Sequence, residues 1–441
     1  MKPTPSQIYS IKTKFNEMNN KVDFLNLLNY SKEILYQEKF IPFSLKQLNF
    51  YISKDSKKNS FDKKVYHSFE IKKKSGANRV IHAPVKGLKE FQMVLNIILQ
   101  CVYVPHKAAT GFVMGKSIVE NAKQHAGKLY VYNIDLKEFF PSVDSARVWG
   151  RLLAKPFNLG GSNGRKQIAN MIKTLCCQSM PVERSIDGQW RMVQASVLPQ
   201  GAPTSPILTN AICERLDIKL SGLAKRFNLN YTRYADDITF SSNHNTYNLS
   251  SNEGETIFKK DSSFDKELRR IIKDQNFYIN ESKVRLQKSG YKQEVTGLVV
   301  NDKINVSRNY IKNLRHWLYF WERFGYDKAS ILFTKKYLED KGHNEKEKPN
   351  MAMVIEGKLL FLKMVKGDKD STYFKLKNRF ETLTTVKKYK QLSTSDNLVK
   401  EDNSIYYSGK NEKTNNEINN QEIIDLIFER GLDEAMKLYS K

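Results

Sequence analysis

Two adjacent acidic residues, Asp236 and Asp237, stand between two runs of β-forming residues in the segment YTRYADDITFSS. The spacing predicts a tight β-hairpin with the acids at its tip. Two carboxylates this close repel each other unless a cation neutralises them. A lone pair of acids on a turn is most often only a solvated turn, so a chemical role needs support from elsewhere in the chain.

A third acid, Asp135, ends the separate β-run LYVYNIDL. Strands of one sheet can bring Asp135 next to Asp236 and Asp237, and their hard oxygen ligands suit Mg²⁺. Two such ions roughly 4 Å apart can activate a primer hydroxyl and stabilise a departing pyrophosphate. The three aspartates are therefore predicted as metal ligands and as catalytic residues for phosphoryl transfer.

The elements that must position these acids follow in order along the chain. Apolar residues at helical spacing predict helices in residues 1–60, and FEIKKKSGANRVIHAP then predicts a basic β-hairpin before Pro84. An amphipathic helix follows Pro84, and helical stretches are expected over 146–195. The prolines and glycine of LPQGAPTSPILTN forbid regular structure until a helix begins near Pro206.

The second half of the chain continues this pattern. Residues 242–263 are rich in Asn and Ser and are interpreted as a surface insertion, and 264–283 predict a helix that ends in FYINESK. QEVTGLVVN predicts another hairpin, and 307–385 are helical and basic. Residues 390–421 are polar and predict a flexible linker before a last amphipathic segment.

Composition narrows the class of partner. The 441 residues carry 73 Lys and Arg against 47 Asp and Glu, a formal net charge of +26, and this surplus favours nucleic acid as partner, with a membrane surface second. The 40% hydrophobic residues exclude disorder throughout the chain. No 18-residue apolar run and no apolar leader are found, so the sequence predicts a cytoplasmic protein without membrane contact.

Taken together, these segments resemble the ordered motifs of a reverse transcriptase over about residues 65–385, and YADD at 234–237 is similar to the family signature Y-x-D-D. The resemblance implies an α+β right-hand polymerase fold, with fingers, palm and thumb, N-terminal helices and a C-terminal extension. The implied parts are an N-terminal helical appendage at 1–64, fingers at 65–128, a palm at 129–306 with a fingers insertion at about 146–195, a helical thumb at 307–385, and a flexible linker with a C-terminal helical segment at 386–441.

The resemblance also implies roles for single residues. Phe140, five residues after Asp135, matches the aromatic residue that lies under the deoxyribose and excludes a 2′-hydroxyl. Gln200 matches a contact to the incoming dNTP, and Lys74 and Arg79 match the basic pair of the fingers that holds the triphosphate. Lys283 matches the family's candidate general acid for pyrophosphate.

Two further elements resemble hallmarks of retron reverse transcriptases. One is N-A-x-x-H, with Asn121 and His125, and the other is V-T-G, with Val295, Thr296 and Gly297; we expect these residues to bind RNA. A retron enzyme recognises a structured noncoding RNA, primes from an internal 2′-hydroxyl, and makes a branched RNA–DNA hybrid that works with an effector protein in anti-phage defence. The resemblance therefore implies three partners for this protein: a structured noncoding RNA, its DNA product and an effector protein.

Other interpretations stay open. The insertion at 242–263, the long 307–385 segment and the tail to Lys441 leave room for another bacterial defence-associated reverse transcriptase, protein-primed or initiating de novo. An intron maturase-like enzyme is a further alternative, although no cluster of histidines and cysteines follows the expected thumb. A non-catalytic RNA-binding module is disfavoured because all three aspartates are intact. GFVMGKS at 111–117 is one residue short of a P-loop and is rejected as an ATP site.

Overall fold

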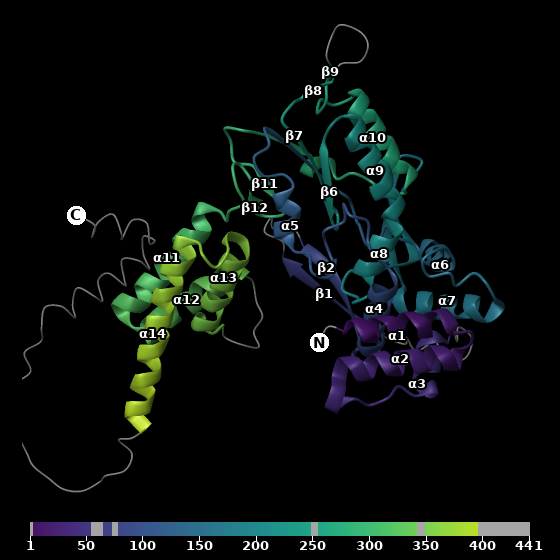
Figure 1. Cartoon of the computed structure of the whole chain (residues 1–441), viewed down its shortest axis with the longest axis horizontal. Helices are drawn as coiled ribbons and strands as arrows, with labels where there is room; N and C mark the ends of the chain where they lie inside the picture. The colour runs from purple at the N-terminus through teal and green to yellow at the C-terminus, as the bar shows by residue number, and fades with distance from the viewer. Residues whose placement is uncertain (1–2, 54–64, 73–77, 248–254, 342–348, 396–441) are drawn as a thin grey trace, which may run out of the picture. The chain divides into compact units, whose positions relative to one another are not determined.

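The computed structural model describes residues 3–53, 65–72, 78–247, 255–341 and 349–395 (Figure 1). Helices alternate with antiparallel strands along this part of the chain, which confirms the predicted α+β class. Among the described residues, no helix has both the length and the apolar composition that crossing a membrane requires.

Three capped helices open the chain, and a short 3₁₀ turn follows the second of them. They are α1 (Pro5–Glu17), α2 (Lys21–Tyr36) and α3 (Leu45–Ile52). Each begins with a capping box, in which two side chains accept hydrogen bonds from each other's backbone N–H groups: Thr4 with Gln7, Asn20 with Asp23, and Ser44 with Gln47. The helices predicted for residues 1–60 are therefore confirmed over the part described.

The next elements are a hairpin and a long helix. Strands β1 (Tyr66–Lys72) and β2 (Asn78–Pro84) pair antiparallel, as predicted, and the tip at 73–77 lies outside the described residues. Helix α4 (Lys86–Val102) follows Pro84 and packs against α1 and α2. The N-terminal helices thus share one hydrophobic core with the centre of the molecule rather than forming a separate core.

A four-stranded antiparallel sheet carries the predicted acids. Its order is β10–β3–β7–β6, with β3 at Tyr130–Asp135, β6 at Asn230–Tyr234, β7 at Asp237–Ser242 and β10 at Arg285–Lys288. Central strand β3 is built from Tyr, Val and Ile, which favour a pleated and largely buried strand. Helix α9 (Glu214–Arg226) packs against β6, and α10 (Ser263–Asp274) packs against α9 (Figure 1).

The segment between β3 and β6 differs from the prediction in its second half. Helices α6 (Ser145–Leu153) and α7 (Asn163–Cys176) occupy the first half, and α8 (Ser205–Ile212) begins next to Pro206, as expected. The prediction of helix up to residue 195 is wrong, because β4 (Gln178–Ile186) and β5 (Gln189–Val197) form a hairpin. Its two-residue turn, Asp187–Gly188, has positive φ at both positions, and Asp-Gly between alternating apolar residues is a strong hairpin signal.

The surface insertion at 242–263 is only partly a surface feature. It contains the two-residue strands β8 (Thr246–Tyr247) and β9 (Glu255–Thr256), while 248–254 lie outside the described residues. Ile257 and Phe258 are buried in the main core, and the ring of Phe258 stacks on Tyr132. The end of the insertion therefore helps to hold the sheet.

Short elements complete this part of the chain. Helix α5 (Ile118–Lys123) precedes β3, and a 3₁₀ turn spans Glu281–Lys283. Strands β11 (Glu294–Val295) and β12 (Leu298–Val299) form the hairpin predicted from QEVTGLVVN, with Thr296 and Gly297 as its two-residue tip.

Four helices follow. They are α11 (Arg308–Phe324), α12 (Tyr326–Lys341), α13 (Met351–Lys366) and α14 (Ser371–Ser395), so the helices predicted over 307–385 are confirmed where described. Helix α11 packs against α12 and α13 through buried Trp317, Leu318 and Trp321. The expected extension at 386–441 begins as helix, because α14 continues to Ser395, and residues 396–441, with the linker and final segment, lie outside the described residues.

Candidate active site

The strand register brings the three predicted aspartates together. Asp135, the last residue of β3, pairs directly with Asp237, the first residue of β7. Tyr234 pairs with Asp237, so Ala235 and Asp236 form the tip of the predicted hairpin. The backbone N–H of Leu136 also donates to the Asp236 carbonyl oxygen at 3.1 Å. Three acids from two segments a hundred residues apart in sequence therefore meet at one end of the sheet.

The three carboxyl groups crowd one another. Desolvation, and then the neighbouring Asp135, raise the pKa of Asp236. Desolvation, followed by Asp236 and Asp135, raises the pKa of Asp237 to about 7. Repulsion of this kind is what a divalent cation relieves, and carboxylate oxygens are the donors that Mg²⁺ takes. The chemistry of the donor set therefore fits the predicted metal.

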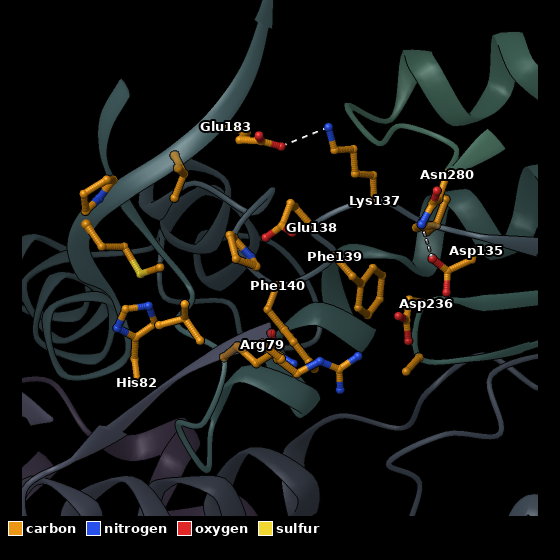
Figure 2. Close-up of a pocket in the computed structure, with 18 of the residues that line it drawn as sticks. Arg79, His82, Asp135, Lys137, Glu138, Phe139, Phe140, Glu183, Asp236 and Asn280 are labelled. Atoms are coloured by element: carbon orange, nitrogen blue, oxygen red, sulfur yellow. Dashed lines mark hydrogen bonds and ion pairs between the residues drawn. The ribbon is translucent and has the colours of Figure 1, made fainter. Parts of the chain in front are cut away.

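Two protein groups also contact the Asp135 carboxylate. Lys283 Nζ lies 2.8 Å from Asp135 Oδ2. Asn280 Nδ2 donates to Asp135 Oδ1 at 3.2 Å (Figure 2). Over the ranges that the structure describes, no group of three or more acidic, histidine or cysteine side chains has the arrangement of a metal-binding site, the three aspartates included. In this conformation the ammonium group of Lys283 supplies the positive charge beside Asp135.

A pocket of about 730 Å³ opens on the Asp236 side (Figure 2). Six of the residues predicted from the sequence line it: Arg79, Asp135, Phe140, Gln200, Asp236 and Lys283. Lys74, the other half of the predicted basic pair, lies outside the described residues. The structure therefore gathers nearly all of the predicted nucleotide-binding residues around a single cavity.

The irregular LPQGAPTSP loop is joined to the β1–β2 hairpin at this pocket. The N–H of His82 in β2 donates to the Gln200 carbonyl oxygen at 2.8 Å. Gly201 has φ of +127°, and a Cβ there would lie 2.6 Å from the His82 carbonyl oxygen. Only glycine fits that backbone conformation and that close approach, so the loop carrying Gln200 and the strand carrying Arg79 form one wall.

The opposite wall comes from the β4–β5 hairpin, which sequence reasoning missed. Met180, Val182, Glu183 and Met192 line the pocket. Lys137, two residues after Asp135 and three before Phe140, forms an ion pair with Glu183 at 2.9 Å (Figure 2). The Asp187–Gly188 turn noted above is the signal that would have found this wall.

A second pocket, of about 520 Å³, lies on the other side of the aspartates. Asp135 and Lys283 line both pockets, whereas Asp236 lines only the first and Asp237 only the second. Tyr234, Arg285, Thr296 and Gly297 are among the other lining residues of the second pocket. The acids therefore stand between two cavities, as a site that joins two reactants requires.

The five residues expected to bind RNA divide into two groups. Asn121, His125 and Val295 are fully buried, and the ring nitrogens of His125 lie 2.7 Å from the hydroxyls of Ser241 and Thr232. Burial lowers the pKa of His125 to about 3, so the ring is neutral. These three side chains are packed inside the protein and present no surface to RNA in this conformation.

Thr296 and Gly297 instead form the tip that borders the second pocket. Both have positive φ, +47° and +82°, and a β-branched residue with positive φ is uncommon. Asn121 Nδ2 lies 3.4 Å from Thr296 Oγ1, so one motif supports the other. The structure thus joins the two sequence motifs into a single unit beside Asp237.

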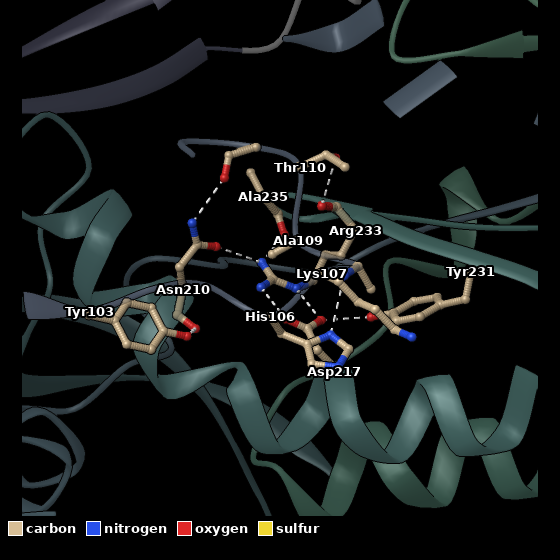
Figure 3. Close-up of polar contacts among 12 residues, drawn as sticks. Tyr103, His106, Lys107, Ala109, Thr110, Asn210, Asp217, Tyr231, Arg233 and Ala235 are labelled. Carbon is tan, nitrogen blue, oxygen red and sulfur yellow. Dashed lines mark hydrogen bonds and ion pairs between the residues drawn. The ribbon is translucent and has the colours of Figure 1, made fainter. Parts of the chain in front are cut away.

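A buried polar network lies under the YADD turn, and sequence reasoning missed it as well (Figure 3). Arg233, in β6, forms a fully buried ion pair with Asp217 of α9 at 2.7 Å. Arg233 Nη1 donates to the Ala235 carbonyl oxygen at 3.0 Å and to Asn210 Oδ1 at 3.2 Å. An arginine in a strand that is otherwise buried was the available signal.

Comparisons with known proteins identify a family. The family described as "Reverse transcriptase (RNA-dependent DNA polymerase)" matches residues 71–301, a range that contains every predicted site residue. Retron Mx65 reverse transcriptase from Myxococcus xanthus is 36% identical over 258 residues, which cover 58% of this chain and 55% of that protein. Retron Ec86 reverse transcriptase from Escherichia coli is 30% identical over 256 residues, covering 57% of this chain and 68% of that protein.

The chain thus spans about half the length of the Mx65 relative, by the 55% that the alignment covers. Among solved structures, apo telomerase from Candida tropicalis matches with a TM-score of 0.38 and 11% identity, covering 74% of this chain and 64% of that one.

Proposed function

The chain belongs to the reverse transcriptase (RNA-dependent DNA polymerase) family, in its retron type, and from this premise we propose that it is the RNA-directed DNA polymerase of a retron. Family membership confirms the predicted right-hand polymerase fold. In the proposal, residues 65–128 are fingers, 129–306 palm and 307–385 thumb, with 1–64 and 386–441 as appendages. The enzyme copies a structured noncoding RNA into single-stranded DNA from dNTPs in the cytoplasm, where such RNA is made.

The observation that carries this proposal is the position of the aspartates between two cavities. A polymerase must hold a dNTP on one side of its acids and a primer terminus on the other. The 730 Å³ pocket on the Asp236 side contains Arg79, Phe140 and Gln200, so we assign it to the dNTP. The 520 Å³ pocket on the Asp237 side is assigned to the primer terminus.

Three residues of the first pocket, Arg79, Phe140 and Gln200, have proposed roles in binding the dNTP. Arg79 is a permanent cation with a planar fork of donors, which suits a triphosphate, and Lys74 is proposed to act beside it. Phe140 lies between the rings of Phe112 and Phe139, at centroid distances of 6.1 and 5.4 Å, and is proposed to exclude a 2′-hydroxyl. Gln200 is proposed to contact the dNTP.

The aspartates are proposed to hold two Mg²⁺ ions. Those ions would supply activation of the attacking hydroxyl and stabilisation of the leaving pyrophosphate. Asp135, Asp236 and Asp237 place their charges so that the reactants align, and alignment supplies much of the rate in phosphoryl transfer. Lys283, 2.8 Å from Asp135, is proposed to carry the proton that the pyrophosphate takes when it leaves.

The retron assignment adds partners. The relatives with 36% and 30% identity are both named retron reverse transcriptases. We propose that Thr296 and Gly297 contact the RNA beside the primer terminus, that Asn121, His125 and Val295 hold this tip from inside, and that the branched product works with an effector protein in anti-phage defence. A positively charged surface, with +26 over the chain, supports RNA as the template.

The test is to express the protein with its flanking genomic DNA, isolate the nucleic acid that copurifies with it, and digest this material with RNase. A discrete single-stranded DNA is expected, with a branched ribonucleotide at its end that a debranching enzyme removes. The band must be absent with the Asp236→Ala, Asp237→Ala variant, which serves as the matched control.

Two results would contradict parts of the proposal. A heterogeneous or repetitive DNA, or a DNA attached to protein, would leave a reverse transcriptase but replace the retron with another defence-associated system. DNA that persists in the double variant would overturn the catalytic assignment itself.

A further inference from the structure

Arg233 lies in β6 two residues before Ala235, and its side chain is fully buried. We propose that Arg233 is a positioning residue for nucleotidyl transfer: locked by Asp217, its guanidinium holds the Ala235 carbonyl and thereby fixes the directions of Asp236 and Asp237. This inference rests on the proposed polymerase function for its kinetic readout, but its geometry concerns only the turn.

The guanidinium is first immobilised by its partner. Arg233 Nε donates to Asp217 Oδ1 and Nη2 donates to Asp217 Oδ2, both at 2.7 Å, which is the bidentate geometry that fixes an arginine most tightly. The Tyr231 hydroxyl adds a hydrogen bond to Asp217 Oδ1 at 2.8 Å. Burial lowers the pKa of Arg233, but the nearby carboxylate of Asp217 outweighs this and raises the pKa well above its usual value. Arg233 is therefore a fixed cation.

The remaining nitrogen of the guanidinium points at the catalytic turn. Arg233 Nη1 donates to the Ala235 carbonyl oxygen at 3.0 Å, and that carbonyl belongs to the tip of the hairpin (Figure 3). The same nitrogen donates to Asn210 Oδ1, while Asn210 Nδ2 donates to the Gly111 carbonyl oxygen at 2.9 Å. Arg233 and Asn210 thus tie the turn to the segment around Gly111.

Gly111 confines the turn from another direction. A Cβ on Gly111 would lie 2.6 Å from the Ala235 backbone nitrogen and 3.0 Å from the Tyr234 carbonyl carbon, so the two backbones are in direct contact. Ala235 itself has φ of +56°, a conformation that residues with a side chain rarely adopt. A rare conformation persists only where its surroundings hold it, and here the hydrogen bond and the close backbone contact do so.

Stability alone does not explain a buried ion pair at this place. Replacing a buried ion pair by well-packed apolar residues is often neutral or stabilising, because two charges must be desolvated. An apolar pair at positions 217 and 233, however, has no donor for the Ala235 carbonyl. The feature that requires arginine is the hydrogen bond to the Ala235 carbonyl oxygen. Ala235 precedes Asp236, which lines the first pocket, and Asp237, which lines the second.

The first test displaces the turn without changing any charge. Gly111→Ala introduces the Cβ that meets Ala235 N, and misplacement of reacting groups by about 1 Å can cost about 100-fold in rate. We expect kcat on a primed RNA template to fall by about that factor, while the KM for dNTP and the Kd for primer–template stay close to wild type. Gly222→Ala in α9 is the matched control, because a Cβ there meets no atom within 4 Å.

The second variant, Arg233→Lys, keeps the cation beside Asp217 but loses the planar fork. A single ammonium group does not reproduce both the bidentate contact and the hydrogen bond to Ala235. We expect folded protein with a reduced kcat and little change in the KM for dNTP, so the kcat and KM effects separate as they would not for a merely structural residue.

A metal readout makes the test independent of polymerisation. Mn²⁺ titration of the full chain without nucleic acid, followed by electron paramagnetic resonance, should give weaker binding for Gly111→Ala and Arg233→Lys than for wild type and Gly222→Ala. Wild-type Mn²⁺ affinity together with wild-type kcat per folded molecule in both variants would overturn the proposal. If the wild-type enzyme extends no primer at all, the proposed function fails while the Mn²⁺ comparison still decides the role of Arg233.

Discussion

Two hairpins border the candidate active site, and they are held in different ways. The β6–β7 hairpin carries Asp236 and Asp237, and it is fixed by the Arg233–Asp217 pair, whose side chains are both 0% exposed. The β4–β5 hairpin forms the far wall of the 730 Å³ pocket and is fixed by the pair of Lys137 with Glu183, whose side chains are 31% and 43% exposed.

The difference follows from what each hairpin must do. The aspartates must keep one arrangement, so the β6–β7 turn is fixed by contacts that cannot be exchanged for water. The β4–β5 wall faces the cavity that we propose takes the dNTP, and partly exposed ion pairs are weak and easily remade. Arg184 adds a second tie of this kind, to Asp144 Oδ1 at 2.8 Å and to the Pro141 carbonyl oxygen at 2.7 Å. We infer a rigid side and an adjustable side to the same pocket.

The largest expected effect is on the rigid side. Asp236→Asn should lower kcat by about 10³-fold or more, because metal-assisted charge stabilisation supplies several kcal/mol of the barrier. Single-nucleotide incorporation on a primed RNA template measures it, with Asp237→Asn assayed in parallel. The unfolding midpoint and RNA affinity should stay near wild type, and activity within about tenfold of wild type would exclude the residue from catalysis.

A second change compares the two ion pairs through stability. Asp217→Ala leaves Arg233 buried without a partner and should reduce the free energy of unfolding by about 3–5 kcal/mol. Urea denaturation followed by circular dichroism measures this loss. The matched variant Glu183→Ala removes a partly exposed partner, and similar losses in both variants would refute the distinction between the hairpins.

Acid should destabilise the core around His125, which lies between β6 and β7. Burial holds the pKa of His125 at about 3, below its usual value of 6.5, so between these values the unfolded chain binds a proton that the folded one does not. The free energy of unfolding should therefore fall with decreasing pH below about 6.5, by about 1.4 kcal/mol per pH unit from this group. Urea denaturation from pH 7 to pH 5 measures the slope, and His125→Gln should flatten it; an unchanged slope would contradict the assignment.

Phe140, the proposed aromatic gate, lines the same pocket. Phe140→Ala should raise the use of ribonucleotides relative to deoxyribonucleotides by about tenfold or more, since removing the ring opens space for the 2′-hydroxyl. Competing incorporation of dATP and ATP opposite the same template base measures the ratio. Phe112→Ala, which removes the neighbouring ring without removing the gate, is the control, and an unchanged sugar preference for Phe140→Ala would remove it from this role.

The smallest effect belongs to the adjustable wall. Glu183→Gln breaks the ion pair with Lys137 and should cost less than about 1 kcal/mol of stability, as partly exposed pairs do. The KM for dNTP should rise by a few-fold with little change in kcat, because the wall moves and the aspartates do not. Steady-state kinetics at low and high salt measure it, and a kcat loss as large as that of Gly111→Ala would show that the wall is as rigid as the turn.

Local patterns in the sequence predicted the elements that carry the acids. The alternating residues of YTRYADDITFSS fixed a two-residue hairpin turn, and the register then left Asp236 at the tip and Asp237 opposite Asp135. The same kind of pattern is present in the β4–β5 segment, at Asp187–Gly188, where the prediction of helix up to residue 195 is wrong.

Other features of the site depend on distant partners. Asn121 and His125 were expected at an RNA-binding surface, yet both are buried, and their hydrogen-bond partners come from β6, β7 and the Thr296 tip. Arg233 and Asp217 are separated by 16 positions in different elements, and no local pattern pairs them. The type of a polar residue does not determine whether its side chain will form hydrogen bonds with water, RNA or protein.

The sequence by itself determined the chemistry of this protein: three carboxylates, a basic chain and the order of motifs that identify a reverse transcriptase. These features reside in residue type and short-range spacing, which backbone periodicity translates directly into strands and turns. Only the tertiary structure decided which side of the acids each pocket lies on, which motif residues are buried, and how the catalytic turn is held. Those outcomes depend on the packing of segments far apart in the chain, and burial and hydrogen-bond partners are properties of that packing.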